Sequence, residues 1–233
     1  MNEADFEQIL GYRFRDRELL VRALTHSSYC REKDLPHTRC NERLEFLGDA
    51  FLDAVAGEEL YRRLERNDEG QLTKKRALVV CERSLAVVGK RLDIGSYLNL
   101  GVGEEHTGGR RRTSVTADAV EAVIGAIYLD GGYEAVKAFI LREFRGLIDE
   151  ALAGKLFPDY KTQVQEILQR GGNMPKICYE LDRTEGPDHE KMFFVHLSVN
   201  GEPCGRGSGR SKKEAEQDAA RHSLEGGLLE HVF

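Results

Sequence analysis

The feature that most constrains the fold is a change of hydrophobic period near residue 153. From Phe6 to about Leu152, apolar residues recur mainly at spacings of three and four, which is the period of helices buried on one side. Further on, Phe193, Val195, Leu197 and Val199 occupy every second position, as in a half-buried strand. Two such periods in one chain predict an all-helical domain followed by a domain that contains a sheet.

The expected elements define two domains of different class. Helices of the first are expected at Asp16 to Ser28, Asn41 to Leu64, Glu69 to Val80, Cys81 to Arg91, Thr113 to Leu129 and Tyr133 to Leu152. In the second, a helix at Tyr160 to Gln169, three strands including Ile177 to Leu181 and Met192 to Val199, and, after the glycine-rich stretch Gly205 to Gly209, a helix from Ser211 to about Leu229 predict a small α+β domain. We expect domains at residues 1–152 and 159–229, joined by a linker at 153–158.

Composition limits the class of protein without identifying it. No apolar run approaches the roughly 18 residues that span a bilayer, and the first ten residues lack a signal-peptide pattern, so we expect a cytoplasmic protein with no membrane partner. The five cysteines are odd in number and none forms a Cys-x-x-Cys pair, which favours reduced, structural thiols. The chain has 34 basic and 40 acidic residues, and this net charge of −6 argues weakly against a nucleic-acid partner.

Local charge gives a different indication from net charge. Basic residues cluster at Lys74 to Arg76, at Arg110 to Arg112, and from Arg206 to Lys213, where no acidic residue intervenes. Such patches are able to meet phosphate groups even on an acidic protein.

Two groups of carboxylates carry the strongest chemical signal. On a helical wheel Glu42, Glu45 and Asp49 stand at about 0°, 300° and 340°, so they share one narrow face and repel one another. Asp118 and Glu121 lie one turn apart on a segment that is otherwise almost wholly apolar and is therefore expected to be buried. Buried carboxylates need partners, and neither segment supplies a lysine, so a hard cation with oxygen ligands such as Mg²⁺ fits both groups.

The alternative is that these acids pair with arginines as ordinary surface ion pairs. For either group alone that interpretation is favoured, because acidic helical faces are common. The presence of both groups in one chain favours the metal site.

The segment Asn41-Glu-Arg-Leu-Glu-Phe-Leu-Gly-Asp49 resembles the signature of bacterial ribonuclease III. The similarity extends in family order to Ala23-Leu-Thr-His-Ser-Ser28, Asp68-Glu-Gly-Gln-Leu-Thr73 and Ala117-Asp-Ala-Val-Glu-Ala122, and it covers essentially the whole chain. The resemblance implies an all-α ribonuclease III endonuclease domain followed by an α+β (α-β-β-β-α) double-stranded RNA-binding domain.

The resemblance also implies roles for six acidic residues. Glu45, Asp49, Asp118 and Glu121 would be the metal ligands, while Glu42 and Glu69 would help to place the RNA strand. The implied cofactor is Mg²⁺, for which Mn²⁺ substitutes, and no organic cofactor is expected. Water activated by the metal would attack the phosphorus in line, leaving 5′-phosphate and 3′-hydroxyl ends. His26 and the cysteines stay outside this mechanism, and His26 is expected to be structural.

Phe46 shares the helix of the first acidic group. As a large aromatic residue it could be part of the core, yet the matching position in the family contacts a second subunit. A homodimer would then place two metal centres on one duplex and leave two-nucleotide 3′ overhangs. Processing of ribosomal RNA precursors, and of some mRNA and tRNA precursors, is the cellular role that the resemblance implies.

The carboxyl-terminal part carries a second signal for RNA. Lys212 and Lys213 fall in the first turn of a helix that Ser211 and Glu214 would cap, where cations oppose the helix dipole by about 0.3 to 1 kcal/mol each. A bound anion would compensate, and Arg206 and Arg210 lie next to it in sequence.

This part resembles a double-stranded RNA-binding domain, in which recognition follows A-form shape and 2′-hydroxyls. By that resemblance the RNA contacts would be Thr162, Gln165 and Glu166 in one minor groove, His189 in the next, and Arg210, Ser211, Lys212 and Lys213 near the phosphates between them. With 11 basic against 13 acidic residues after Ala153, its own binding should be weak and salt-dependent, and the dimer should supply most of the affinity.

Two other functions remain open on the sequence alone. A binding protein of the same fold that has lost catalysis would lack a metal ligand, and all four are present. A small-molecule phosphohydrolase would leave the carboxyl-terminal domain unexplained.

Overall fold

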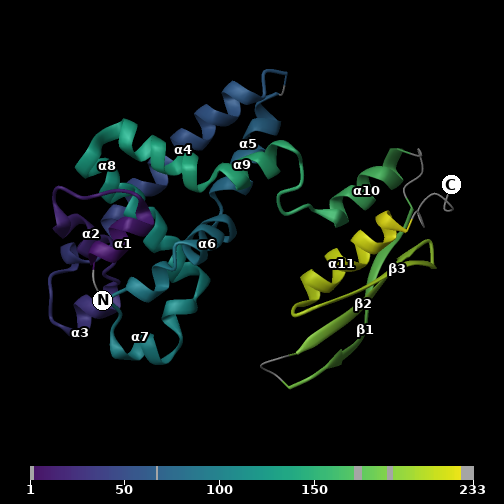
Figure 1. The fold of residues 1–233 in the computed structure, drawn as a ribbon. Coiled ribbons are helices and arrows are strands. Elements are labelled where there is room, and N and C mark those ends of the chain that lie inside the picture. The colour runs from purple at the N-terminus through teal and green to yellow at the C-terminus, as the bar shows by residue number, and fades with distance from the viewer. Residues whose placement is uncertain (1–2, 67, 171–174, 188–190, 227–233) are drawn as a thin grey trace. The chain divides into compact units, whose positions relative to one another are not determined.

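The protein consists of two compact units, residues 1–156 and 157–233, which are drawn in Figure 1. The computed structural model describes residues 3–66, 68–170, 175–187 and 191–226. The first unit is helical and the second has the chain order helix, three strands, helix, which confirms the predicted fold class. The first unit ends at Leu156, a buried side chain, while the bounds of the linker stay a prediction.

Nine α-helices and three short 3₁₀ helices are described in the first unit. They are α1 (Glu3–Leu10), α2 (Arg17–Ala23), α3 (Ser27–Glu32), η1 (His37–Arg39), α4 (Glu42–Arg63), α5 (Glu69–Val80), α6 (Glu82–Arg91), η2 (Ile94–Tyr97), α7 (Val102–His106), η3 (Gly109–Arg111), α8 (Thr113–Glu143) and α9 (Arg145–Leu152). Aspartates cap two of them at the N-terminus, because Asp16 accepts from Glu18 N and Asp68 accepts from Gln71 N. In the described part of the chain, no helix is both long and apolar enough to span a membrane.

The single helix expected from Asp16 to Ser28 is wrong, because the chain breaks it near Thr25. Thr25 forms an isolated bridge with Asn99, and its side-chain oxygen accepts from Asn99 Nδ2 at 3.1 Å. Its carbonyl accepts from Asn41 N at 2.8 Å. These partners are distant in sequence, so apolar spacing does not report them.

The break expected between the helices Thr113 to Leu129 and Tyr133 to Leu152 is present as a kink within α8. Gly132 has a non-helical backbone with a φ of 80°, which only glycine adopts readily, and helical residues continue beyond it to Glu143. The single helix expected from Tyr133 to Leu152 is wrong, because Phe144, which is fully buried, separates α8 from α9.

Helices α4 and α8 pack with their backbones in direct contact. A Cβ atom on Gly48 would lie 1.7 Å from the carbonyl oxygen of Glu121, and one on Gly125 would lie 2.2 Å from that of Leu44. Any side chain at either position would force the helices apart. The two glycines therefore fix the separation of the helices that carry the acidic groups.

The second unit is an antiparallel sheet covered on one face by two helices. Its elements are α10 (Tyr160–Arg170), β1 (Ile177–Glu185), β2 (Met192–Val199), β3 (Glu202–Gly209) and α11 (Lys212–Glu225), with strand order β1-β2-β3. Both helices lie on the same side of the sheet in Figure 1. They bury a core that consists of Val164, Leu168, Val195, Leu197, Val199, Cys204, Ala215, Ala219 and Ala220.

The glycine-rich stretch and the end of the last helix differ from the other predicted elements of the second unit. The glycine-rich stretch from Gly205 belongs to β3 instead of leading into the helix. A Cβ on Gly207 would lie 2.1 Å from the backbone nitrogen of Ala219, so small residues let α11 approach the strand. The expected end of the last helix, Leu229, falls outside the described residues.

Replacing Gly48 by alanine should destabilise the first unit. Overpacking typically costs about 1 to 3 kcal/mol, and a contact with backbone cannot be relieved by a rotamer change, so we expect about 3 kcal/mol. Calorimetric unfolding of the full chain should show the lower transition temperature.

Gly57→Ala on the same helix is the matched control. Its Cβ would meet only Arg76 Cδ at 3.7 Å, and the gain in helix propensity is about 0.5 to 1 kcal/mol. Equal effects of the two substitutions would contradict the tight contact at Gly48.

Candidate metal centre and nucleic-acid interface

The α4 and α8 contact brings three carboxylates together. Glu45, Asp118 and Glu121 each offer an oxygen atom within 4.8 Å of those of the other two, and all three side chains are partly buried. In the described part of the chain no lysine or arginine forms an ion pair with them. Three of the four expected metal ligands thus form one compact group without an ion pair to any described lysine or arginine.

The other predicted acidic residues surround this group to different degrees. Asp49 is exposed, and its charge is the neighbouring charge that most raises the pKa of Glu121. Glu42 is also exposed and raises the pKa of Glu45. Glu69 begins α5 as an exposed residue, and no contact places it beside the carboxylate group.

Burial and mutual repulsion hold these carboxyls in the protonated form to unusually high pH. Burial, together with the charges of Asp49 and Glu45, raises the pKa of Glu121 to about 8. Burial likewise raises the pKa of Glu45 to about 7, with Asp118 the next cause. The pKa of Asp118 is raised by burial as well. Crowded acids without a basic partner fit a divalent cation, which accepts oxygen ligands and removes the repulsion.

His26 and Glu82 are further titratable neighbours of Asp118, outside the acidic residues already named. His26 lowers the pKa of Asp118 and Glu82 raises it, although burial has the larger effect. His26 also precedes α3, where its Nδ1 accepts from Ser28 N at 3.3 Å. Sequence analysis did not single out Glu82, because it lies on α6 and comes near Asp118 only when α6 packs on α8.

Phe46 does not join the core of its own chain. Its side chain is 81% exposed, although it stands one residue from Glu45 on α4. An exposed phenylalanine within a carboxylate helix is costly unless another surface covers it.

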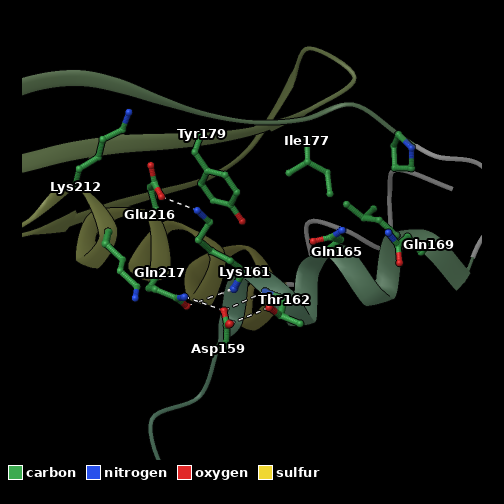
Figure 2. Close-up of a pocket in the computed structure, with 13 residues that line it drawn as sticks. Asp159, Lys161, Thr162, Gln165, Gln169, Ile177, Tyr179, Lys212, Glu216 and Gln217 are labelled. Carbon is green, nitrogen blue, oxygen red and sulfur yellow. Dashed lines mark hydrogen bonds and ion pairs between the residues drawn. The ribbon is translucent and has the colours of Figure 1, made fainter. Parts of the chain in front are cut away.

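In the second unit, a groove of about 1040 Å³ lies between α10, β1 and the start of α11 (Figure 2). Among the residues that line it are four of the predicted RNA contacts: Thr162, Gln165, Lys212 and Lys213. The structure thus places residues about 50 positions apart on one surface. Gln169, one turn beyond Gln165, also lines the groove and could have been found by the same helical spacing.

On the inner wall of the groove, charged and polar side chains pair with one another, although the buried hydroxyl of Tyr179 has no hydrogen-bond partner within the described residues. Lys161 Nζ pairs with Glu216 at 2.6 Å and lies 4.6 Å from the centre of the Tyr179 ring, as Figure 2 shows. Asp159 accepts from Gln217 Nε2 at 2.8 Å. Sequence analysis missed these residues, because nothing in the sequence reports which strand residue faces which helix.

The start of α11 supplies the positive charge at the groove. Ser211 caps the helix by accepting from Glu214 N at 3.2 Å, and the Glu214 carboxylate accepts from Arg210 N at 2.9 Å. Within the described residues, Lys212 and Lys213 have no ion-pair partner. Two uncompensated lysines at a helix N-terminus leave this end able to bind phosphate.

Two other predicted RNA contacts, Glu166 and His189, are not among the described residues that line the groove. Glu166 is exposed on α10 but does not line the groove. His189 lies outside the described residues.

Comparisons with known proteins agree with both sites. A Ribonuclease-III-like family model matches residues 16–146, and a double-stranded RNA binding motif model matches residues 160–226. The chain is 47% identical to Ribonuclease 3 of Clostridium perfringens over 226 residues, covering 97% of this chain and 94% of that protein. It is 50% identical to Ribonuclease 3 of Clostridium acetobutylicum over 222 residues, covering 95% of each.

A solved structure of the nuclease domain of ribonuclease III from Campylobacter jejuni matches 62% of this chain and 97% of its own, with 43% identity and a TM-score of 0.58. The chain therefore belongs to the ribonuclease III family, the endoribonucleases specific for double-stranded RNA. Dependence on a divalent metal is general in this family, and the carboxylate group of α4 and α8 has the donor set for it.

Stabilisation by Mg²⁺ should grow with pH. Without metal, the folded chain keeps protons on Glu45 and Glu121 at a pH where the unfolded chain has lost them, so stability falls as pH rises from about 4.5 through 7 to 8. Mg²⁺ binds the deprotonated carboxylates and reverses this loss. The increase in unfolding temperature on adding Mg²⁺ should be larger at pH 8.5 than at pH 6.

Glu121→Gln should raise the unfolding temperature of the metal-free protein at pH 8.5. Partial exposure reduces the effect to about 1 kcal/mol, or roughly 2 to 4 °C. Glu59→Gln, whose carboxylate pairs with Arg63 on the same helix, is the control. An increase with Mg²⁺ that is independent of pH would show that these carboxyls are not its ligands.

Lys212→Ala with Lys213→Ala should weaken duplex RNA binding and flatten its salt dependence. If each lysine meets one phosphate, the slope of log K against log salt should fall by about one per lysine. Gel shifts of the full chain in Ca²⁺ in place of Mg²⁺, across a salt series, measure it. Arg221→Ala, on the same helix and paired with Asp218, should leave the slope unchanged.

Proposed function

We propose that the chain cleaves double-stranded RNA at the carboxylate group between α4 and α8. Glu45, Asp49, Asp118 and Glu121 would hold the divalent metal, which is Mg²⁺, with Mn²⁺ able to substitute. The observation that carries this proposal is that Glu45, Asp118 and Glu121 offer oxygen atoms within 4.8 Å of one another in a partly buried place, where burial raises the pKa of Glu45 and Glu121. Such an arrangement is unfavourable by itself and becomes favourable when a dication binds.

The metal, when bound, supplies charge for activating water and for stabilising the leaving 3′ oxygen. The side chains have a positioning role. Glu45, Asp118 and Glu121 are held by two helices whose separation cannot change, so their oxygens keep a fixed spacing. Glu42 and Glu69, both exposed, would help to place the RNA strand beside the metal. The products would be 5′-phosphate and 3′-hydroxyl ends.

A homodimer would give the enzyme two such centres. Phe46 is the proposed dimer contact, because its 81% exposure leaves a large apolar surface to be covered. The description of the Campylobacter jejuni nuclease domain refers to a region involved in dimer formation. Two centres on one duplex would leave two-nucleotide 3′ overhangs.

The second unit would hold the duplex by shape. Thr162, Gln165 and Glu166 would enter one minor groove, and His189 the next. Arg210, Ser211, Lys212 and Lys213 would lie near the phosphates between them. We propose residues 159–229 as this domain and 153–158 as its linker. Ribosomal RNA precursors and some mRNA and tRNA precursors in the cytoplasm are the proposed substrates.

The test compares wild type with Glu121→Gln on long duplex RNA and on single-stranded RNA, with Mg²⁺ or with chelator. Wild type should cleave only duplex and only with Mg²⁺. Changing a residue that only orients a metal ligand typically costs about 10 to 100-fold, so losing a ligand itself should reduce cleavage by about 100-fold or more. Duplex binding should survive.

Glu59→Gln should cleave like wild type and controls for the change of charge on α4. Equal cleavage by Glu121→Gln would overturn the assignment of the metal ligands. Intact duplex with wild type in every condition, despite binding, would instead indicate a scaffold protein.

A further inference from the structure

We infer that His37, Cys40 and Glu42 form a second metal site, selective for a zinc-like ion. Each of these three side chains offers a ligand atom, and the three atoms lie within 4.8 Å of one another. His37 begins η1, Cys40 follows that turn directly, and Glu42 is the first residue of α4. All three ligands therefore come from six consecutive residues at the entrance to the carboxylate helix.

One of the three ligands is buried and two are exposed. Cys40 is fully buried, and its Sγ donates to the carbonyl oxygen of His37 at 3.0 Å. In the His37 ring, Nδ1 lies 4.0 Å from Cys40 Sγ and Nε2 lies 3.0 Å from Glu42 Oε2. An ion takes only one ring nitrogen, so small side-chain movements have to bring the three ligand atoms around it. This is possible because the His37 side chain is 68% exposed and that of Glu42 is 46% exposed.

The backbone between the ligands is fixed. Asn41 is buried, its N–H donates to Thr25 O at 2.8 Å, and its carbonyl accepts from Leu44 N at 2.8 Å. These bonds hold Cys40 and Glu42 at set positions on either side of Asn41. The entropy cost of assembling the site is reduced accordingly, since only side chains move on binding.

The donor set distinguishes this site from the catalytic group. Imidazole nitrogen, thiolate sulfur and carboxylate oxygen are the three ligand types of zinc, whereas Mg²⁺ prefers oxygen alone. The thiol of Cys40 releases its proton to solvent when the ion binds. Three protein ligands leave the fourth position of a tetrahedral ion for water.

Glu42 links the site to catalysis, a consequence that rests on the proposed function. It stands one turn before Glu45 on α4, on the face that carries the catalytic carboxylates. When zinc takes the Glu42 carboxylate, that carboxylate stays beside His37 and Cys40 and is not available to the RNA strand. Zinc binding should therefore inhibit cleavage.

Binding is tested with Co²⁺ as a spectroscopic probe on the full chain. We expect one tetrahedral Co²⁺ with a sulfur-to-cobalt charge-transfer band, absent in Cys40→Ser and weakened in His37→Gln, which changes an exposed residue. Cys81→Ser is the matched control, because Cys81 also precedes a helix and its Sγ donates to a carbonyl three residues earlier. The absence of a band in wild type, or its persistence in both variants, would overturn the site.

Inhibition is tested by titrating Zn²⁺ into cleavage reactions that contain excess Mg²⁺, with each variant normalised to its own rate without zinc. His37→Gln should need at least tenfold more Zn²⁺ for half inhibition than wild type or Cys81→Ser. Equal sensitivity would mean that zinc acts at the catalytic carboxylates and would overturn the regulatory role. The cobalt spectrum does not depend on cleavage, so failure of the proposed function would leave it unaffected.

Discussion

The contact between the backbones of α4 and α8 is the constraint on which the site depends. Gly48 and Gly125 let each helix reach the carbonyl groups of the other, a distance at which any Cβ would collide. Helices normally pack with side chains between them, at interaxial distances of about 8 to 10 Å. Here the missing side chains bring the acids of both helices within reach of a single ion.

That closeness creates an electrostatic problem as well as a site. Glu45 and Glu121 are brought together where burial and mutual repulsion disfavour their charged forms. A stable fold tolerates this conflict because protons relieve it in the free protein and a dication relieves it in the active one. The packing that stabilises the helical unit and the affinity for metal thus have the same origin.

Close packing through small residues also positions the groove of the second unit. Small residues of β3 allow α11 to lie close to the sheet, and this brings the start of α11 beside α10. Lys161 and Glu216 satisfy each other within the groove, while Lys212 and Lys213 remain available to an external anion. Net charge therefore predicts little here, because ion pairs such as Lys161 with Glu216 neutralise part of it while Lys212 and Lys213 stay unpaired in the described part of the chain.

The predictions made from the sequence were most complete for features that depend on a short segment. The helical spacing of Glu42, Glu45 and Asp49, and of Asp118 with Glu121, placed each acidic group on one face of its helix. The helix cap at Ser211 was also predicted from its neighbours in sequence, and it is present. The predictions were wrong at Thr25, where partners at Asn41 and Asn99 break an expected helix, and at Phe144, where α8 ends and α9 follows.

What the sequence determined by itself is the fold class, the family, and which side chains share a face, because these follow from period and motif within short segments. Only the tertiary structure decided which faces meet. It brought Glu45 to Asp118 and Glu121, set Thr162 in the same groove as Lys212, and left Phe46 exposed. The physical reason is that contacts between distant segments depend on close packing of whole elements, which no local pattern encodes.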